Sequence, residues 1–349
     1  MKLQLGMTRT KLSAICGGIV LMAIIILLWI IFSSVVAGER SQEFELKIRS
    51  GTSFNQIMRL LVHRNIVESD WKPRFTARLL GWHGKLKAGK YRIRSELSSY
   101  GLLKLLVDGR VAVERVTLPE GLQSRELAAI LANRIEVDST RFVAGVQDQD
   151  FCKALGIPGS SLEGFLFPDT YDFYWGMNAK QVIRIMVNQF HSQFNDSLRM
   201  GAEATGKSII EILTLASIIE GEAVLDSERA LISAVYHNRL RRGMRLQADP
   251  TIQFIIPDGP RRLLKKDLEM DSPYNTYKYS GLPPGPINNP GLASIVASMN
   301  PARANYLYFV ANGDGSHTFS MTLQEHLRAK ARFDSYRRSV RHSQKTKGK

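Results

Sequence analysis

The chain has 349 residues, of which 44% are hydrophobic and 23% charged, and a formal net charge of +15. This length and composition exclude a disordered chain and allow a membrane segment plus one or two domains with cores of their own. The positive charge favours anionic partners, whereas the two cysteines, Cys16 and Cys152, have no neighbours at metal-ligand spacing and are not expected to form a disulfide.

Residues 12–37 form an uncharged, strongly apolar run near the N-terminus. About 20 apolar residues suffice to cross a bilayer as a helix, and a signal peptide has a shorter apolar stretch of about 7–15 residues. The run therefore predicts a transmembrane helix. Val35 and Ala37 also fit the small-residue pattern of a cleavage site, so removal as a signal peptide is the alternative.

Basic residues precede this run: Lys2, Arg9 and Lys11. By the positive-inside rule, residues 1–11 are expected in the cytoplasm and everything after Gly38 outside it. The chain is therefore predicted to be a single-pass protein of the inner (cytoplasmic) membrane with a periplasmic or extracytoplasmic main part. That location argues against nucleic acid as a partner, in spite of the charge.

Two segments of the exported part follow the same strand–turn–helix pattern. Apolar residues alternate at 44–48, a turn follows at Gly51, and apolar residues at helical spacing come next. The pattern recurs from residues 113–118 through a turn at Gly121. Glycine suits a turn that needs a positive φ. The likeness is either an internal repeat or chance, because such units are common.

The other expected elements lie on both sides of a proline-rich loop region that follows Pro250. In chain order they are a turn and strand at 86–93, a helix at 100–107, short helices and loops at 138–176, helices at 179–194 and 207–221, a buried strand at 306–310, a turn at 312–315 and a returning strand at 317–321. The strongly basic end of the chain is expected to be a solvated tail.

The helix at 208–221 is apolar on almost every side and is predicted to be buried. On a helical wheel Glu220 lies on the same side as Leu213, whereas Glu211 and Glu222 lie opposite. Burial without a cationic partner raises the pKa of a carboxyl group, which a general acid needs near neutral pH. Glu220 is therefore the candidate acid, and a structural glutamate in the core is the alternative.

Loops on either side of this helix carry many amide, hydroxyl and aromatic side chains. Such groups on rigid loops are typical of sugar-binding clefts, and the alternative is that they are well-ordered connections. The loops are residues 247–251, 272–277 and 281–287. Residues 162–171 combine aromatic residues with two carboxylates, and they either line the cleft or fill the core.

Taken together, these segments resemble the endolytic murein transglycosylase family, also called YceG-like proteins. The resemblance covers nearly the whole chain after the apolar run. It rests on LASIIE at 215–220, SER at 227–229, NRL at 238–240, GMRLQADPT at 243–251, YNTY at 274–277 and GLPPGPI at 281–287, together with PEG at 119–121, EG at 163–164, PDTY at 168–171 and HTF at 317–319. Two positions differ from the family pattern: Phe254 replaces a common Tyr, and Gly221 follows the glutamate where Lys is frequent.

The resemblance implies an α+β protein with an N-terminal transmembrane helix, a small LysM-like α/β module and a mixed α+β catalytic domain. The expected division is a cytoplasmic N-terminus at 1–11, the membrane helix at 12–37, the LysM-like module at 43–114, the catalytic domain at 115–335 and the basic tail at 336–349. It also assigns catalysis to Glu220. The candidates for binding and orienting the sugar are Glu163, Gln247, Asp249, Asn275, Thr276, Tyr277 and His317.

The expected reaction cuts the bond between N-acetylmuramic acid and N-acetylglucosamine within nascent glycan strands and leaves 1,6-anhydro ends. Glu220 would protonate the glycosidic oxygen and then accept the proton of the C6 hydroxyl group. No metal or cofactor is implied. The expected partners are peptidoglycan glycan strands, the membrane and proteins of cell-wall synthesis. The alternative is a glycan-binding scaffold without catalysis.

Overall fold

The computed structural model describes residues 9–38, 42–49, 51–109, 111–257 and 259–347. Lys2 of the N-terminal flank lies outside the described residues. The chain divides into two compact units. Unit 1 comprises Met1–Glu114 with Arg134–Glu136 and Asp172–Met177, and unit 2 comprises Arg115–Asn133, Val137–Tyr171 and Asn178–Lys349. The structure is of the α+β class, and each unit is described by itself.

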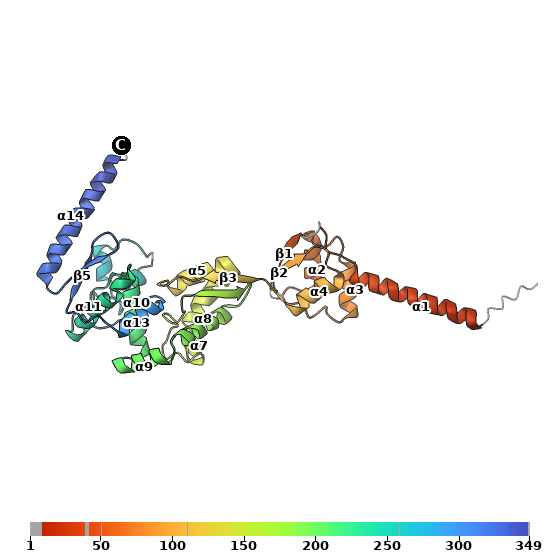
Figure 1. Cartoon of the computed structure of the whole chain (residues 1–349), viewed down its shortest axis with the longest axis horizontal. Coiled ribbons are helices and arrows are strands. Elements are labelled where there is room, and N and C mark those ends of the chain that lie inside the picture. Colours follow the sequence, from red (N-terminus) through yellow and green to blue (C-terminus); the bar gives the residue numbers. More distant parts are fainter. Residues whose placement is uncertain (1–8, 39–41, 50, 110, 258, 348–349) are drawn as a thin grey trace, which may run out of the picture. The chain divides into compact units, whose positions relative to one another are not determined.

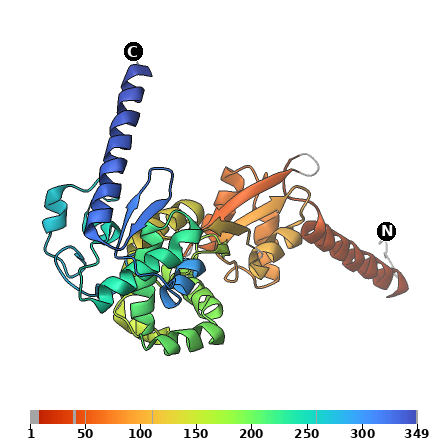
Figure 2. The ribbon, with the colours of Figure 1, turned by 60° about the vertical axis from the view of Figure 1, so that its left-hand side comes forward.

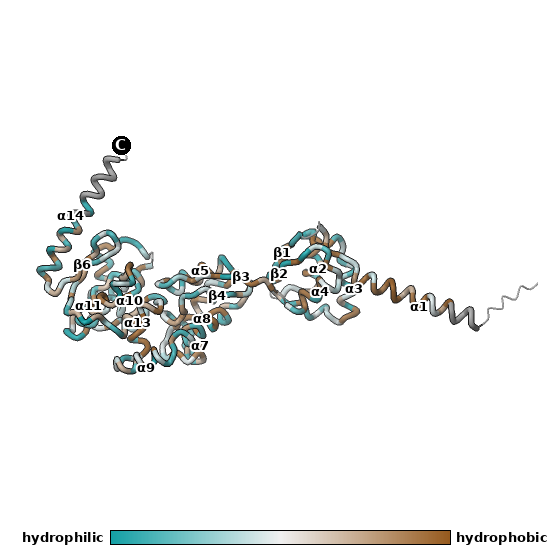
Figure 3. Tube along the Cα trace, in the orientation of Figure 1, coloured by the Kyte–Doolittle hydropathy of each residue, from teal (hydrophilic) through white to brown (hydrophobic). Residues whose placement is uncertain are grey.

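Helix α1 (Arg9–Phe32) is the apolar N-terminal segment (Figure 3). Its stretch Ile15–Phe32 is long and apolar enough to cross a membrane, with 6% of it buried. The predicted end at residue 37 is wrong, because the helix stops at Phe32. Val35 donates its N–H to the carbonyl oxygen of Leu97 (3.0 Å), and Val36 is buried in the core of unit 1.

After α1, unit 1 consists of a two-stranded antiparallel sheet and three helices (Figure 1). Its elements are β1 (Glu43–Ile48), α2 (Phe54–His63), α3 (Trp71–Leu79), β2 (Gly89–Arg94) and α4 (Ser99–Asp108). The predicted first strand–turn–helix is confirmed. Gly51 has a φ of 82°, and Ser53 forms a capping box with Gln56 at the start of α2.

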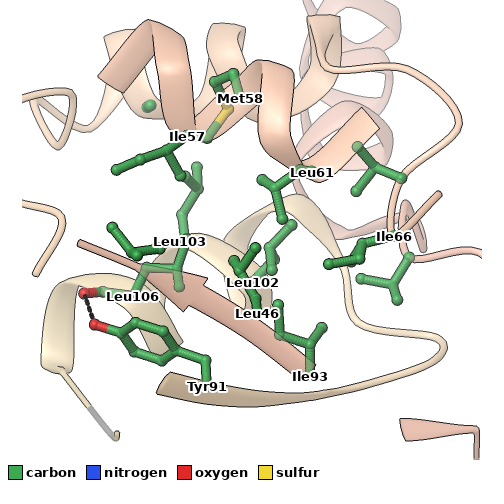
Figure 4. Close-up of a cluster of buried hydrophobic side chains, with 14 residues drawn as sticks. Leu46, Ile57, Met58, Leu61, Ile66, Tyr91, Ile93, Leu102, Leu103 and Leu106 are labelled. Atoms are coloured by element: carbon green, nitrogen blue, oxygen red, sulfur yellow. Dashed lines mark hydrogen bonds between the residues drawn. The ribbon is translucent and has the colours of Figure 1, made fainter. Parts of the chain in front are cut away.

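The core of unit 1 lies between this sheet and α2 and α4 (Figure 4). Alternation in β1 buries Leu46 and Ile48, which pack with Leu61 of α2 and Leu102 of α4. Tyr91 of β2 is buried too, and its hydroxyl group donates to the carbonyl oxygen of Lys87 (2.6 Å). Burial raises the pKa of Tyr91 to about 12. The apolar pattern therefore accounts for this small core.

The second strand–turn–helix opens with β3 (Val113–Thr117), which pairs with β4 (Thr170–Tyr174). Gly121 follows with a φ of 76°. The helices then continue as α5 (Ser124–Ile135), α6 (Ser139–Val146), α7 (Gln149–Ala154), α8 (Ala179–Gln193), α9 (Asp196–Thr205), α10 (Ile209–Glu222), α11 (Arg229–Arg241), α12 (Asp249–Ile255) and α13 (Leu292–Met299). Strand β4 differs from the prediction for residues 138–176, which was of short helices and loops.

A hairpin and a long helix complete unit 2. Strands β5 (Tyr308–Ala311) and β6 (His317–Ser320) are antiparallel. The strand predicted at 306–310 is therefore present, but β5 is half-buried where a buried strand was predicted. Helix α14 (Leu323–Lys347) begins beside this hairpin and continues to Lys347 (Figure 2). The predicted tail is therefore helical over most of its length, because arginine, lysine and alanine favour helices.

Candidate active site

Helix α10 holds the candidate glutamate at its last turn. The helix begins at Ser208, which forms a capping box with the exposed Glu211, and every residue from Ile212 to Ile219 is buried. The side chain of Glu220 is 7% exposed. In the fold, α10 packs against α11, α12 and α13 (Figure 1). The helical wheel therefore placed Glu211 outside and Glu220 inside, as observed.

Contrary to the expectation of burial without a cation, Glu220 has a cationic partner. Nη1 of Arg229 lies 3.1 Å from Oε2 of Glu220, and the backbone N–H of Gly291 donates to the same oxygen (3.1 Å). Gly291 is the N-cap of α13, where the helix dipole favours negative charge. These three groups come from α10, α11 and α13. A helical wheel of α10 alone could not reveal partners on other helices.

Arg229 is shared by three carboxylates. Besides Glu220, its Nε lies 2.9 Å from Asp226, and its Nη2 lies 3.9 Å from Glu120 in the turn after β3. The guanidinium group is 9% exposed and also donates to Ser294 of α13. One buried cation thus faces three acidic groups. Partial burial and the nearby Glu220 raise the pKa of Glu120 above its usual value.

Two glycines make room for this arrangement. A Cβ atom on Gly291 would lie 2.0 Å from the carboxyl carbon of Glu120, so that carboxyl group occupies the space of a missing side chain. A Cβ atom on Gly221 would lie 2.6 Å from Cβ of Pro250. The second contact explains why glycine follows Glu220 here: α10 and α12 approach too closely for lysine at this position.

Four of the predicted sugar-binding residues line one pocket of about 480 Å³ in unit 2. They are Gln247, Asp249, Tyr277 and His317. Glu222, which was expected to point away from the site, lines the same pocket, together with Tyr236, Arg239 and Phe309 among others. Four of the seven predicted sugar-binding residues thus share one pocket, and the carboxylate of α10 in its lining is Glu222.

Glu222 comes closer than Glu220 to the environment that was expected for Glu220, although Arg239 lies in the same pocket. Glu222 accepts a hydrogen bond from the hydroxyl group of Tyr236 (3.2 Å), a neutral partner. Burial, reinforced by the nearby Asp249, raises the pKa of Glu222 to about 7. Around it, the hydroxyl group of Tyr277 donates a hydrogen bond to Asp249, and Nδ1 of His317 lies 2.7 Å from Oε2 of Glu228. The pocket therefore offers polar groups suited to a carbohydrate.

Gln247 has an unusual backbone. Its φ is 50°, in the left-handed region that residues other than glycine seldom adopt, while its side chain is exposed at the pocket. Its N–H donates to the carbonyl oxygen of Thr276 (3.1 Å), which fixes this conformation. Strain of this kind is commonly found at functional sites.

Asn275 and Thr276 are buried beneath the pocket loops. The amide of Asn275 donates to the carbonyl oxygens of Leu268 (3.0 Å) and Met270 (2.7 Å). The hydroxyl group of Thr276 accepts from the N–H of Ala248 (3.0 Å). Both side chains therefore bond to protein loops, and in this structure they hold those loops in place.

Glu163 lies apart from this pocket, enclosed by polar groups. It accepts hydrogen bonds from the hydroxyl of Ser124 (2.7 Å) and from the amide of Asn289 (2.8 Å), and burial raises its pKa to about 7. Asn289 also donates to the carbonyl oxygen of Leu122 (3.0 Å) and accepts from the N–H of Gly164 (2.9 Å). This amide joins three distant segments of unit 2.

The partners of Glu220 were not predicted from the sequence. Glu120 and Arg229 belong to motifs that carried the family resemblance, PEG and SER, but no role was derived for either. Gly291 belongs to none of the motifs. Among the residues that the structure describes, no group of three or more His, Cys, Asp or Glu residues is arranged to hold a metal ion.

Comparison with known proteins extends these observations. The model of the YceG-like family matches residues 46–332. An endolytic murein transglycosylase of Bacillus subtilis (strain 168) is 32% identical over 306 residues, covering 83% of this chain and 84% of that protein. One from Streptococcus pneumoniae (strain ATCC BAA-255 / R6) is 30% identical over 65% of this chain and 47% of its own length. A crystal structure of a YceG-like protein from Listeria monocytogenes is similar with a TM-score of 0.58 and 30% identity, covering 82% of this chain and 99% of that one.

Proposed function

The chain belongs to the YceG-like family, and we propose that it is an endolytic peptidoglycan transglycosylase, an enzyme that cuts glycan strands at internal bonds. The B. subtilis relative carries that activity in its name, and the similarity extends over most of both chains. Peptidoglycan is therefore the substrate. The observation that carries the site assignment is the Glu220 carboxylate, held by Arg229 and Gly291 at the end of a buried helix.

Glu220 is the central catalytic carboxylate in this proposal. Its ion pair with Arg229 and the hydrogen bond from the N–H of Gly291 hold the carboxylate in one orientation. A fixed carboxylate beside the scissile bond stabilises an oxocarbenium-like transition state and accepts a proton from a nearby hydroxyl group. An intramolecular glycan cleavage demands both of these tasks, together with protonation of the glycosidic oxygen.

The pocket lined by Gln247, Asp249, Tyr277 and His317 binds the sugar in this proposal. Hydroxyl, amide and carboxylate groups can each exchange hydrogen bonds with sugar hydroxyls, and the aromatic rings of Tyr277 and Phe309 can pack on sugar faces. Asn275 and Thr276 contribute through the loops that they hold. Glu163 contributes through the network of Ser124 and Asn289.

The product is a glycan end carrying 1,6-anhydro-N-acetylmuramic acid. The C6 hydroxyl group of the sugar is part of the bound substrate, so its attack on C1 gains the proximity advantage of an intramolecular reaction. A hydrolase would have to admit and orient a water molecule instead. The cleaved bond is the one between N-acetylmuramic acid and N-acetylglucosamine in nascent strands.

Helix α1 anchors the protein in the inner membrane in this proposal, with the N-terminus in the cytoplasm. Cleavage after Ala37 would remove Val36 from the core of unit 1 and break the hydrogen bond from Val35 to Leu97, which favours an uncleaved anchor. Unit 1 includes the LysM-like module and binds glycan. An alkaline phosphatase fused after Lys349 is expected to be active, and a stable but inactive fusion would refute this orientation.

Muropeptide analysis of glycan treated with the full chain tests the function. Anhydro ends are expected at internal cuts, and mass spectrometry separates them from hydrolysed ends, which are heavier by one water. Reducing ends as the main product would refute the lytic reaction. Glycan binding without any cleavage would indicate a scaffold instead.

A further inference from the structure

We propose that Glu120 is the second catalytic carboxyl group of this site, which donates the proton to the glycosidic oxygen while Glu220 acts as the base. The inference rests on the proposed function, because it divides between two residues the proton transfers that sequence analysis assigned to Glu220 alone. It concerns the proton needed when the glycosidic bond breaks.

The charge balance around Arg229 is the first argument. Glu220, Asp226 and Glu120 share its single buried guanidinium group, at 3.1, 2.9 and 3.9 Å. The side chain of Asp226 is 84% exposed, so water screens its charge, whereas Glu220 and Glu120 both lie against Gly291. Two ionised carboxylates so close together repel each other, which favours retention of a proton by one of these two. Glu120 has the longest contact to the cation and is the group best placed to keep the proton.

The charges around Glu120 also favour a protonated carboxyl group. It faces Glu220 from α10, Arg229 from α11 and Asp226 from η1 (Asp226–Glu228), so two of the three neighbouring charges are negative. Partial burial and Glu220 both raise the pKa of Glu120. A general acid needs such a raised pKa to hold its proton near neutral pH.

Accessibility separates the two carboxyl groups. The side chain of Glu120 is 48% exposed, whereas that of Glu220 is 7% exposed and uses one oxygen on Arg229 and Gly291. Both groups lie against Gly291: its N–H bonds to Glu220, and Glu120 fills the space where a Cβ atom would be. Glu120 is therefore held near Glu220 and remains open to a glycan.

The proton transfers balance without water entering the product. The carboxyl proton of Glu120 moves to the glycosidic oxygen as the bond from C1 to that oxygen breaks. Glu220 takes the proton of the C6 hydroxyl group as the new bond between O6 and C1 forms. The proton then returns from Glu220 to Glu120 through solvent, which restores the resting enzyme.

Two variants of the purified full chain in detergent test this role. Glu120→Gln cannot donate a proton, so the rate of anhydro-end formation is expected to fall about 100-fold. In the wild type, deprotonation of Glu120 lowers this rate at alkaline pH, and the variant is expected not to show that decrease. Gly291→Ala keeps both carboxyl groups and the N–H, at a φ of −75° that alanine accepts, but its methyl group displaces the carboxyl of Glu120. The same loss is expected, with little change in Tm.

The leaving group gives a second readout that a structural role would not move. On a dinitrophenyl glycoside of N-acetylmuramic acid, whose leaving group departs without protonation, Glu120→Gln is expected to stay within about threefold of the wild type, whereas Glu220→Gln stays inactive. Glu203→Gln, at an exposed position of α9, is the control and keeps full activity on both substrates.

The outcomes separate the two proposals. If the wild type forms anhydro ends and Glu120→Gln or Gly291→Ala keeps full activity, the role of Glu120 is refuted and the proposed function stands. If Glu120→Gln is equally impaired on both substrates, Glu120 is structural. If the wild type forms no anhydro ends, the proposed function fails, and the role of Glu120 fails with it.

Discussion

Glu220 and Glu222 stand two residues apart at the end of the same helix, yet their environments differ in kind. Glu220 meets a buried guanidinium group and a helix N-terminus, whereas Glu222 meets the neutral hydroxyl group of Tyr236 in the pocket. Burial raises the pKa of Glu222 to about 7. The comparison teaches that two glutamates at neighbouring positions of one helix end can face quite different partners, because those partners come from other segments of the fold.

The most direct way to break this contrast is to neutralise each glutamate in turn. Glu220→Gln keeps the size of the side chain but cannot accept a proton, so turnover is expected to fall by about 10²–10⁴-fold with little change in Tm. Glu222→Gln is expected to retain much more activity. Muropeptide analysis of both variants measures the difference, and equal losses would contradict the distinct roles.

Removal of the Arg229 guanidinium group tests the contrast between Glu220 and Glu222 by its effect on the free energy of unfolding. Arg229→Met leaves Glu220 buried without its partner, and breaking a buried ion pair from one side costs about 3–5 kcal/mol. Arg242→Met, at an exposed position just after α11, is the matched control and is expected to change the free energy of unfolding by less than about 0.5 kcal/mol. Urea unfolding monitored by circular dichroism measures both. Equal effects would mean that the ion pair contributes nothing.

The pocket loops offer a comparison of their own. Asn275→Ala leaves the carbonyl groups of Leu268 and Met270 without their donor, so the free energy of unfolding is expected to fall by about 1–3 kcal/mol. Gln247→Ala removes an exposed side chain and is expected to weaken substrate binding while Tm stays unchanged. Thermal unfolding and the KM for glycan distinguish the two. If Asn275→Ala has the same Tm as the wild type, Asn275 does not hold the loops in place, and the original prediction that it binds the sugar directly is favoured.

The remaining expected effect is the pH dependence of stability at Glu222. Its pKa is raised from 4.5 to about 7 by folding, so between these values the unfolded chain has released a proton that the folded chain retains. Stability from this group is therefore complete below pH 4.5 and falls as the pH rises to about 7. The free energy of unfolding of Glu222→Gln is expected to be closer to that of the wild type at pH 5 than at pH 8. At pH 8 the variant is expected to be the more stable protein. Urea unfolding at both pH values measures this, and equal differences would refute the raised pKa.

The sequence predicted local features well because they depend on neighbours in the chain. Alternation at 44–48 gave β1, and the apolar run at 208–221 gave a buried α10. The family motifs led to Glu220 and to four residues that share a pocket. Each of these inferences needed only periodicity or a motif.

The features that sequence analysis missed depend on tertiary contacts. Arg229 reaches Glu220 from another helix, and Glu120 reaches the site from a turn 100 residues earlier in the chain. Strand β4 was not predicted because its partner, β3, lies far away in the sequence. No periodicity within one segment contains such information, so the chemistry of the site could be completed only from the fold.

The amide of Asn289 has a consequence for the order in which this molecule matures. It bonds to groups 125 and 167 residues earlier in the chain, at Gly164 and Leu122. Contacts of such sequence separation form late in folding. A nascent chain that ends before residue 289 lacks the amide that joins these segments, and also Gly291 just beyond it. The surroundings of Glu220 are therefore complete only once the chain has been made and folded beyond Gly291, so a shorter nascent chain lacks the assembled site.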